Sequence, residues 1–220
     1  MSNASPLNPN LQLTNEADFK GLPIYTSRGP LVVGCLERIL LTINKSLSEH
    51  PRTLAVRFDL RVPVRYIENL DSSVITRFFE SLKKQIACDT ARKQAKGTRV
   101  HPCSVRYAWV KESTDEFGYP HYHVLLLLNR DRFHCLGDYG AKQGNLAARI
   151  KKAWASALGL QQSKTMGAVH FPENCLYALD INSDTFNEVY PALFFRASYM
   201  AKLETKRYGE GSRSFGTSRN

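Results

Sequence analysis

Two histidines separated by one residue, His121 and His123, are the side chains in this sequence best suited to metal chemistry. Tyr119 and Pro120 form a turn before them, and the apolar run 124–128 that follows predicts a buried strand. Residues two apart in a strand project from the same face, so the two imidazoles would lie side by side and could chelate a divalent cation. The alternative is a pair of half-exposed surface histidines, because the His-x-His spacing is short and common.

A carboxylate comes within reach of this pair if the chain forms a hairpin. Residues 105–112 are aromatic and β-branched and predict a strand, and Asp115–Gly118 is a turn cluster before the histidines. A hairpin of these two strands brings Glu112 close to His121. A carboxylate with two imidazoles is a usual ligand set for Mg²⁺ or Mn²⁺ in reactions of phosphates, which makes Glu112 the candidate third ligand.

Near the C-terminus, Tyr199 and Lys202 are three residues apart, which makes them neighbours on one face of a helix. This helix is predicted to begin at a Ser183–Asp184 cap, with an interruption at Pro191. In a functional interpretation, Tyr199 is a phenolic nucleophile whose developing charge Lys202 stabilises. The alternative is a structural tyrosine with a lysine stem packed beside it.

The charge of the chain favours a polyanionic partner. The sequence has 30 Lys and Arg against 20 Asp and Glu, a formal net charge of +10, and nucleic acid is the usual partner of such a chain. The alternative is a basic protein whose charge serves only solubility. The side chains predicted to contact DNA are Arg57, Arg61, Lys93, Lys96, Arg99, Arg106, Arg196 and Lys206.

The elements that must position these residues are predicted from apolar periodicity. Strand 53–63 alternates apolar and charged residues, which predicts one buried face and one charged face. The remaining predicted elements are helices over 31–47, 72–93 and 144–158 and short strands over 167–171 and 175–179.

Several classes are disfavoured. No apolar run reaches the length of a membrane span, and the N-terminus has no signal-peptide pattern. The five cysteines are odd in number and include no C-x-x-C pair, which favours reduced thiols in the cytoplasm over a thiolate zinc site. No G-x-x-x-x-G-K-[ST] motif is present, so no fused helicase motor is expected.

A charged strand, a His-x-His strand preceded by a glutamate arm, and a helix with Tyr-x-x-Lys follow one another in this order. Over about residues 53–206 this order resembles the HUH endonucleases, which include rolling-circle replication initiators, relaxases and single-tyrosine transposases. The segment Ala197–Lys202 is similar to the nucleophile motif of the initiators of bacterial prophages and inovirus-type phages.

The resemblance implies an α/β (α+β) fold with a ferredoxin/RRM-like central antiparallel sheet of about five strands and packed helices. It implies an N-terminal arm over 1–29 that starts with an apparent tag remnant, an endonuclease domain over 30–207, and a basic tail over 208–220. His121, His123 and Glu112 would hold Mg²⁺ or Mn²⁺. Tyr199 would attack the DNA to give a 5′-phosphotyrosine, and Lys202 would orient the phosphate or the nucleophile.

The implied partners are a single-stranded DNA origin, in extended or hairpin form, and the replication machinery of a bacterial host, in the cytoplasm and away from membranes. Some phage initiators carry two tyrosines four residues apart, but Phe195 stands four before Tyr199 here, which favours a single-tyrosine enzyme. The second nucleophile would come from another subunit or from Tyr208.

Three alternatives stay open. A non-catalytic single-strand binding module would stack bases on Tyr107 and Trp109. A DNA-binding regulator would bind duplex DNA without cutting it. A single-tyrosine transposase or relaxase would share the chemistry and differ in its DNA substrate.

Overall fold

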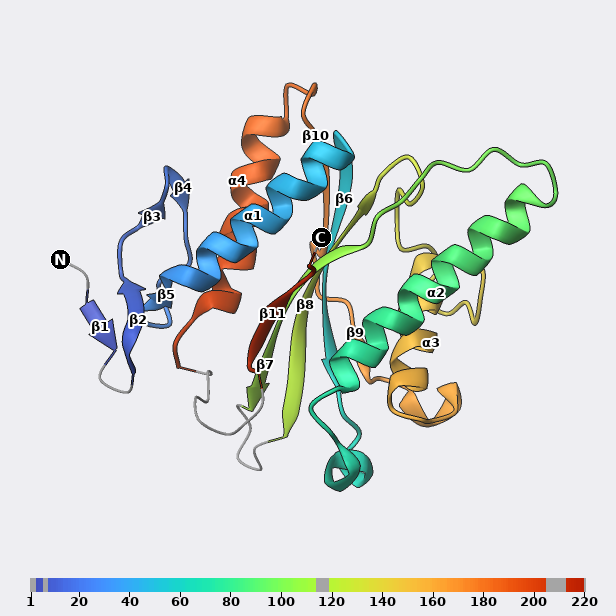
Figure 1. Ribbon diagram of the computed structural model, residues 1–220, viewed down its shortest axis with the longest axis horizontal. Helices are drawn as coiled ribbons and strands as arrows, with labels where there is room; N and C mark the ends of the chain where they lie inside the picture. The colour runs from blue at the N-terminus through green and yellow to red at the C-terminus, as the bar shows by residue number, and fades with distance from the viewer. Residues whose placement is uncertain (1–2, 6–7, 114–118, 205–212, 220) are drawn as a thin grey trace.

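An antiparallel sheet of six strands forms the centre of the computed structural model, which describes residues 3–5, 8–113, 119–204 and 213–219 (Figure 1). The order of its strands is β10-β6-β8-β7-β11, and β9 also pairs with β6. The strands are β6 (Arg52–Arg61), β7 (Arg106–Ser113), β8 (Pro120–Asn129), β9 (Val169–His170), β10 (Leu176–Asp180) and β11 (Phe215–Thr217). The predicted α/β class with a central antiparallel sheet is confirmed.

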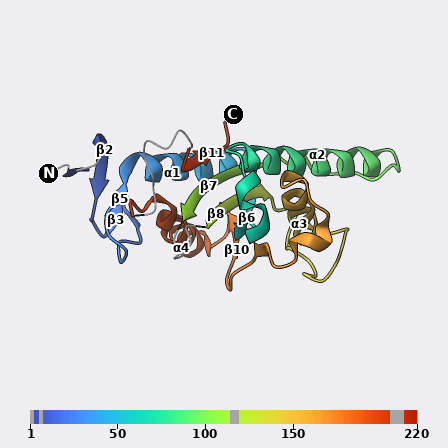
Figure 2. The ribbon, with the colours of Figure 1, turned by 90° about the horizontal axis from the view of Figure 1, so that it is seen from below.

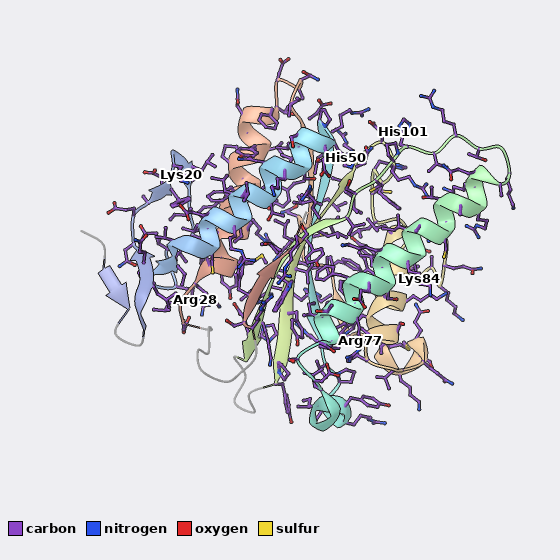
Figure 3. All side chains as sticks on the ribbon, viewed as in Figure 1. Lys20, Arg28, His50, Arg77, Lys84 and His101 are labelled. Atoms are coloured by element: carbon purple, nitrogen blue, oxygen red, sulfur yellow. The ribbon has the colours of Figure 1, made fainter. Side chains whose placement is uncertain are left out.

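Two helices cover each face of the sheet, as Figures 1 and 2 show. Helices α2 (Val74–Gln94) and α3 (Leu146–Ala157) cover one face, and α1 (Val33–Glu49) and α4 (Phe186–Ser198) cover the other. Side chains fill the space between the sheet and both helix layers (Figure 3). No helix in the described part of the chain is long and apolar enough to cross a membrane.

The side chains of β8 alternate between the two faces of the sheet, and this alternation determines the face on which the candidate site lies. Tyr122, Val124 and Leu126 pack into the core under α2 and α3, whereas Leu125 and Leu127 pack under α1 and α4. Successive side chains of a strand point to opposite faces. His121 and His123 therefore lie on the face that α1 and α4 cover.

The predicted charged face of strand 53–63 is wrong as a description of β6. Ala55 and Arg57 are buried on that face, because β6 is a central strand with helices on both sides. Arg57 and Asp59 on this face form an ion pair with each other, and Arg61 at the end of the strand is exposed. The predicted helix start is also wrong, since α4 begins at Phe186 after Thr185, and it continues through Pro191 without interruption.

The two ends of the chain contribute more structure than the sequence predicts. Strands β1 (Asn3–Ser5), β2 (Asn8–Thr14) and β5 (Leu31–Val32) form a small sheet, and β3 (Asp18–Phe19) pairs with β4 (Leu22–Pro23). The Phe19 ring stacks on Phe194 of α4, with centroids 6.4 Å apart. At the other end β11, which lies in the expected tail, pairs with β7 and adds the sixth strand. The expected arm and tail thus both include residues that pack on the domain.

Trp154 of α3 provides a test of the core under α2 and α3. Its side chain is fully buried, and its indole N–H donates to the Arg61 carbonyl oxygen at 2.8 Å. We expect Trp154→Ala to lower the free energy of unfolding by about 3–5 kcal/mol, because it leaves a large cavity and an unpaired carbonyl. Urea denaturation followed by circular dichroism measures the change.

Met166→Ala is the control, since Met166 is 86% exposed and its truncation should change stability by no more than about 0.5 kcal/mol. Equal effects of the two substitutions would contradict this description of the core.

Candidate active site

Strand register brings the candidate metal ligands together. In the β7–β8 hairpin Glu112 lies directly opposite His121, as the predicted hairpin requires. The turn residues 114–118 themselves lie outside the described residues. On the other side of β8, Asp59 of β6 lies opposite His123. Three adjacent strands therefore deliver two carboxylates and two imidazoles to one face of the sheet.

Glu112, His121 and His123 form a compact set of possible metal ligands. One ligand atom from each lies within 4.8 Å of the others. Glu112 Oε2 is 2.9 Å from His123 Nε2 and 3.8 Å from His121 Nε2. Two imidazole nitrogens and a carboxylate oxygen are donors that fit a divalent transition ion such as Mn²⁺. The set leaves coordination positions for other ligands.

The protonation of His121 favours such a site. Burial lowers the pKa of His121, and the neighbouring His123 lowers this pKa further. A neutral imidazole has a lone pair to give to a cation, whereas an imidazolium has none. His121 is therefore ready to bind metal at neutral pH, and its affinity should fall as the pH drops and the ring takes up a proton.

A buried ion pair behind His123 orients its ring. His123 Nδ1 lies 2.5 Å from Asp59 Oδ1 and 2.6 Å from Arg57 Nη2. Nδ1 faces an acceptor in Asp59 and a donor in Arg57. The tautomer that donates to Asp59 leaves the Nε2 lone pair for a cation beside Glu112. Arg57 also binds Asp59 and donates to the Phe58 carbonyl oxygen at 2.7 Å. The Arg57–Asp59 pair thus supports the ligand from behind.

The charge of Asp59 persists in this buried position. Burial alone would raise its pKa, but the hydrogen bond from His123 and the charge of Arg57 outweigh burial and hold the pKa well below its ordinary value. A charged Asp59 stabilises the Nδ1–H tautomer of His123. The sequence prediction placed Asp59 on a charged strand face and did not assign it this role.

Tyr199 and Lys202 lie beside the same carboxylate. Lys202 Nζ donates to the Tyr199 hydroxyl oxygen at 2.5 Å and lies 3.2 Å from Glu112 Oε2. Lys202 is 3% exposed and Glu112 is 1% exposed. The ring of Tyr199 packs edge-on against His123, with centroids 5.6 Å apart. One buried ammonium group therefore joins the candidate nucleophile to the candidate metal ligands.

The contact between Lys202 and Tyr199 does not arise within one continuous helix, as the sequence predicted. Helix α4 ends at Ser198, and Tyr199–Ala201 form a short 3₁₀ turn. Lys202 then leaves the helical conformation, with ψ 140°, and its backbone forms a β-bridge with Leu31. The neighbourhood of Tyr199 and Lys202 is as expected, but a tightened turn and an extended lysine create it.

Two of the residues predicted to contact DNA are buried. Arg57 binds Asp59 as described, and Arg106 forms an ion pair with Glu49. Internal ion pairs occupy both guanidinium groups, and Arg57 also lines a cavity beside Tyr199. Both assignments stay predictions, and periodicity does not show that these two charges have internal partners.

The other predicted DNA contacts have varied environments. Arg61, Lys96 and Arg99 are exposed, and Arg196 is half-buried near Tyr199. Lys93 is half-buried, with its Nζ 3.6 Å from Asp89 Oδ2. Lys206 and Tyr208 lie outside the described residues.

The aromatic residues assigned to a non-catalytic binding module pack internally. Tyr107 stacks on Phe79, with ring centroids 3.4 Å apart. Trp109 is buried, and Gly216 of β11 lies against it so closely that a Cβ there would be 2.7 Å from the indole nitrogen. Neither ring offers a free stacking platform. This arrangement removes the main residue-based argument for the binding-module alternative.

The match to known families covers nearly all of the structure described above. Residues 14–218 match the family model described as the YagK/YfjJ C-terminal domain, and the chain belongs to this family. It is 42% identical over 188 residues to the uncharacterized protein YagK of Escherichia coli (strain K12), covering 80% of this chain and 89% of YagK. It is 36% identical over 195 residues to the uncharacterized protein YfjJ of the same strain, covering 83% and 92%. No solved structure matches the chain.

The ligand set makes a direct prediction for metal binding. Isothermal titration of Mn²⁺ should show one binding site in the wild-type protein and none in His121→Ala, which lacks one of three ligands. Asp59→Asn should weaken binding by about 10–100-fold, because loss of a partner that orients a ligating histidine has this effect.

His134→Ala is the matched control, since His134 is exposed in a loop and its loss should leave the titration unchanged. Wild-type affinity in His121→Ala would contradict the assignment of the ligands.

Proposed function

We propose that this protein is a metal-dependent endonuclease that nicks and rejoins single-stranded DNA through a phosphotyrosine intermediate and so initiates rolling-circle replication of a phage or mobile element. The observation that carries the proposal is the position of the Lys202 ammonium, 2.5 Å from the Tyr199 hydroxyl and 3.2 Å from Glu112. A structural tyrosine needs no such link to two histidines and a buried glutamate. The motif order along the chain supports the same reaction.

The residues of the site have two roles, which are metal binding and nucleophilic attack. A divalent cation held by Glu112, His121 and His123 would polarise the scissile phosphate. Tyr199 attacks the phosphorus atom and loses its phenolic proton. Lys202 stabilises the negative charge that develops on the phenolic oxygen. The buried position of the ammonium strengthens this interaction, because less water screens it.

Bond making and bond breaking balance without an external energy source. The new bond joins the Tyr199 oxygen to phosphorus, and the bond from phosphorus to the 3′-oxygen breaks. The leaving oxygen takes up a proton and becomes a free 3′-hydroxyl. One phosphodiester is exchanged for another, so a later attack by a 3′-hydroxyl on the phosphotyrosine reseals the strand and frees Tyr199.

Covalent capture tests this proposal. Protein mixed with Mn²⁺ and single-stranded oligonucleotides that tile its own genomic neighbourhood should give a protein–DNA band that survives a denaturing gel. Tyr199→Phe should abolish the band, because the ring remains and the nucleophilic oxygen is lost. The oligonucleotide that reacts maps the nick, and its position at a replication origin or at a transposon end separates an initiator from a transposase.

Tyr190→Phe is the matched control. Tyr190 lies on the same helix α4, and its hydroxyl donates to Asn44 Oδ1 at 2.5 Å, away from the metal ligands. This variant should form the adduct at the wild-type level. An adduct that persists in Tyr199→Phe would overturn the assignment of the nucleophile, and no adduct with any oligonucleotide would count against the enzyme.

A further inference from the structure

A cavity of about 400 Å³ opens beside Tyr199, and His121 is not among its lining residues. Its lining consists of Tyr25, Arg57, His123, Phe195, Arg196 and Tyr199. Three of the six side chains are aromatic and two are arginines, of which Arg57 pairs with Asp59, and no acidic side chain is among the described residues that line the cavity. This composition fits a flat aromatic group joined to a negative charge better than it fits an apolar ligand.

We propose that this cavity binds the nucleotide next to the scissile phosphate, with its base stacked on Phe195 and packed edge-on against Tyr25, and with Arg196 contacting its phosphate. The proposal rests on the proposed nuclease function and adds a subsite to it. Tyr25 and Phe195 are the specificity-determining residues of this subsite. The ligand class is a single-stranded nucleotide chain with its base unpaired.

Tyr25 is held firmly enough to act as part of a preformed site. Its backbone N–H donates to the Ser198 hydroxyl oxygen at 2.8 Å, and the preceding Ile24 is buried. The Tyr25 ring lies edge-on to both Tyr199 and Phe195, with centroids 5.7 Å apart in each case. The segment before α1 thus places an aromatic ring next to the nucleophile.

Phe195 and Arg196 supply the open side of the cavity. Phe195 is a large apolar side chain that is 41% exposed on α4, four residues before Tyr199. Arg196 is half-buried, and its guanidinium makes only a long contact of 3.5 Å to the Glu173 carbonyl oxygen among the hydrogen bonds of the described residues. An exposed ring and a weakly bound guanidinium are suited to receive a base and its phosphate.

A second cavity suggests how the DNA strand continues. It has a volume of about 460 Å³, and its lining includes His121, His123 and Arg61. His123 lines both cavities. The two cavities therefore adjoin at His123, so a scissile phosphate held at the ligands would have a neighbouring nucleotide in each cavity.

The test measures stacking without cutting. Fluorescence anisotropy in EDTA compares the affinity of the full-length protein for single-stranded oligothymidylate and for an abasic chain of the same length. Wild-type protein should prefer the chain with bases. Phe195→Ala should reduce this preference by about tenfold, the effect of losing one stacked base. Tyr25→Ala should reduce it by a smaller factor, because its ring packs edge-on. Phe195→Tyr should retain it, because the ring remains.

Tyr139→Ala is the matched control, since Tyr139 is 50% exposed and stacks on Phe171 outside the cavity. It should leave the preference unchanged. Comparing two DNA chains on each variant separates lost stacking from damage to the fold, which would weaken both chains alike.

The outcomes separate the subsite from the nuclease. If wild-type protein prefers bases and both alanine variants keep that preference, the subsite is overturned and the nuclease proposal stands. If wild-type protein forms the covalent adduct and binds abasic and thymidine chains equally, the subsite is also overturned alone. If the protein binds neither chain and forms no adduct, both proposals fail.

Discussion

The buried carboxylate of Glu112 is the group on which the arrangement of the site depends. It is 1% exposed, and a buried carboxylate is strongly destabilising unless it has charged or hydrogen-bonding partners. Lys202 Nζ at 3.2 Å supplies such a partner, and a cation shared with His123 Nε2, which lies 2.9 Å from the carboxylate, would supply another. His123 comes from β8 and Lys202 from the end of α4, so the sheet and the last helix must both be in place to form this arrangement.

This requirement explains the irregular end of α4. The helix stops at Ser198, a 3₁₀ turn follows, and the backbone of Lys202 pairs with Leu31 instead of continuing the helix. The extended lysine reaches both the tyrosine hydroxyl and the glutamate. The N-terminal segment contributes at the same place, because Tyr25 donates its backbone N–H to Ser198. Segments from both ends of the chain thus hold Tyr199 over the sheet.

Much of this site follows from local sequence patterns. The Pro120 turn, the His-x-His alternation and the preceding strand predict a hairpin that brings Glu112 to His121, and the register places them directly opposite each other. Tyr199 and Lys202 are also neighbours, as their spacing predicts. These features depend on residues close together along the chain, where strand alternation and turn chemistry are informative.

The features that the sequence did not predict depend on distant pairings. Asp59 meets His123 only because β6 pairs with β8 across more than sixty residues, and no local pattern encodes that register. The same pairing and the helices over it bury Arg57, which periodicity placed on a charged surface. Tyr25 and the short strand β11, with Gly216 packed against Trp109, lie in segments whose polar composition resembles loops.

The most direct test of the account is a crystal structure of the wild-type protein grown with Mn²⁺, with anomalous diffraction measured to locate the ion. The account predicts an anomalous peak bound by Glu112, His121 and His123, with the Tyr199 hydroxyl facing it. Well-diffracting crystals with Mn²⁺ bound elsewhere, or with no peak among these three side chains, would contradict the central claim that they form a metal centre for phosphoryl transfer.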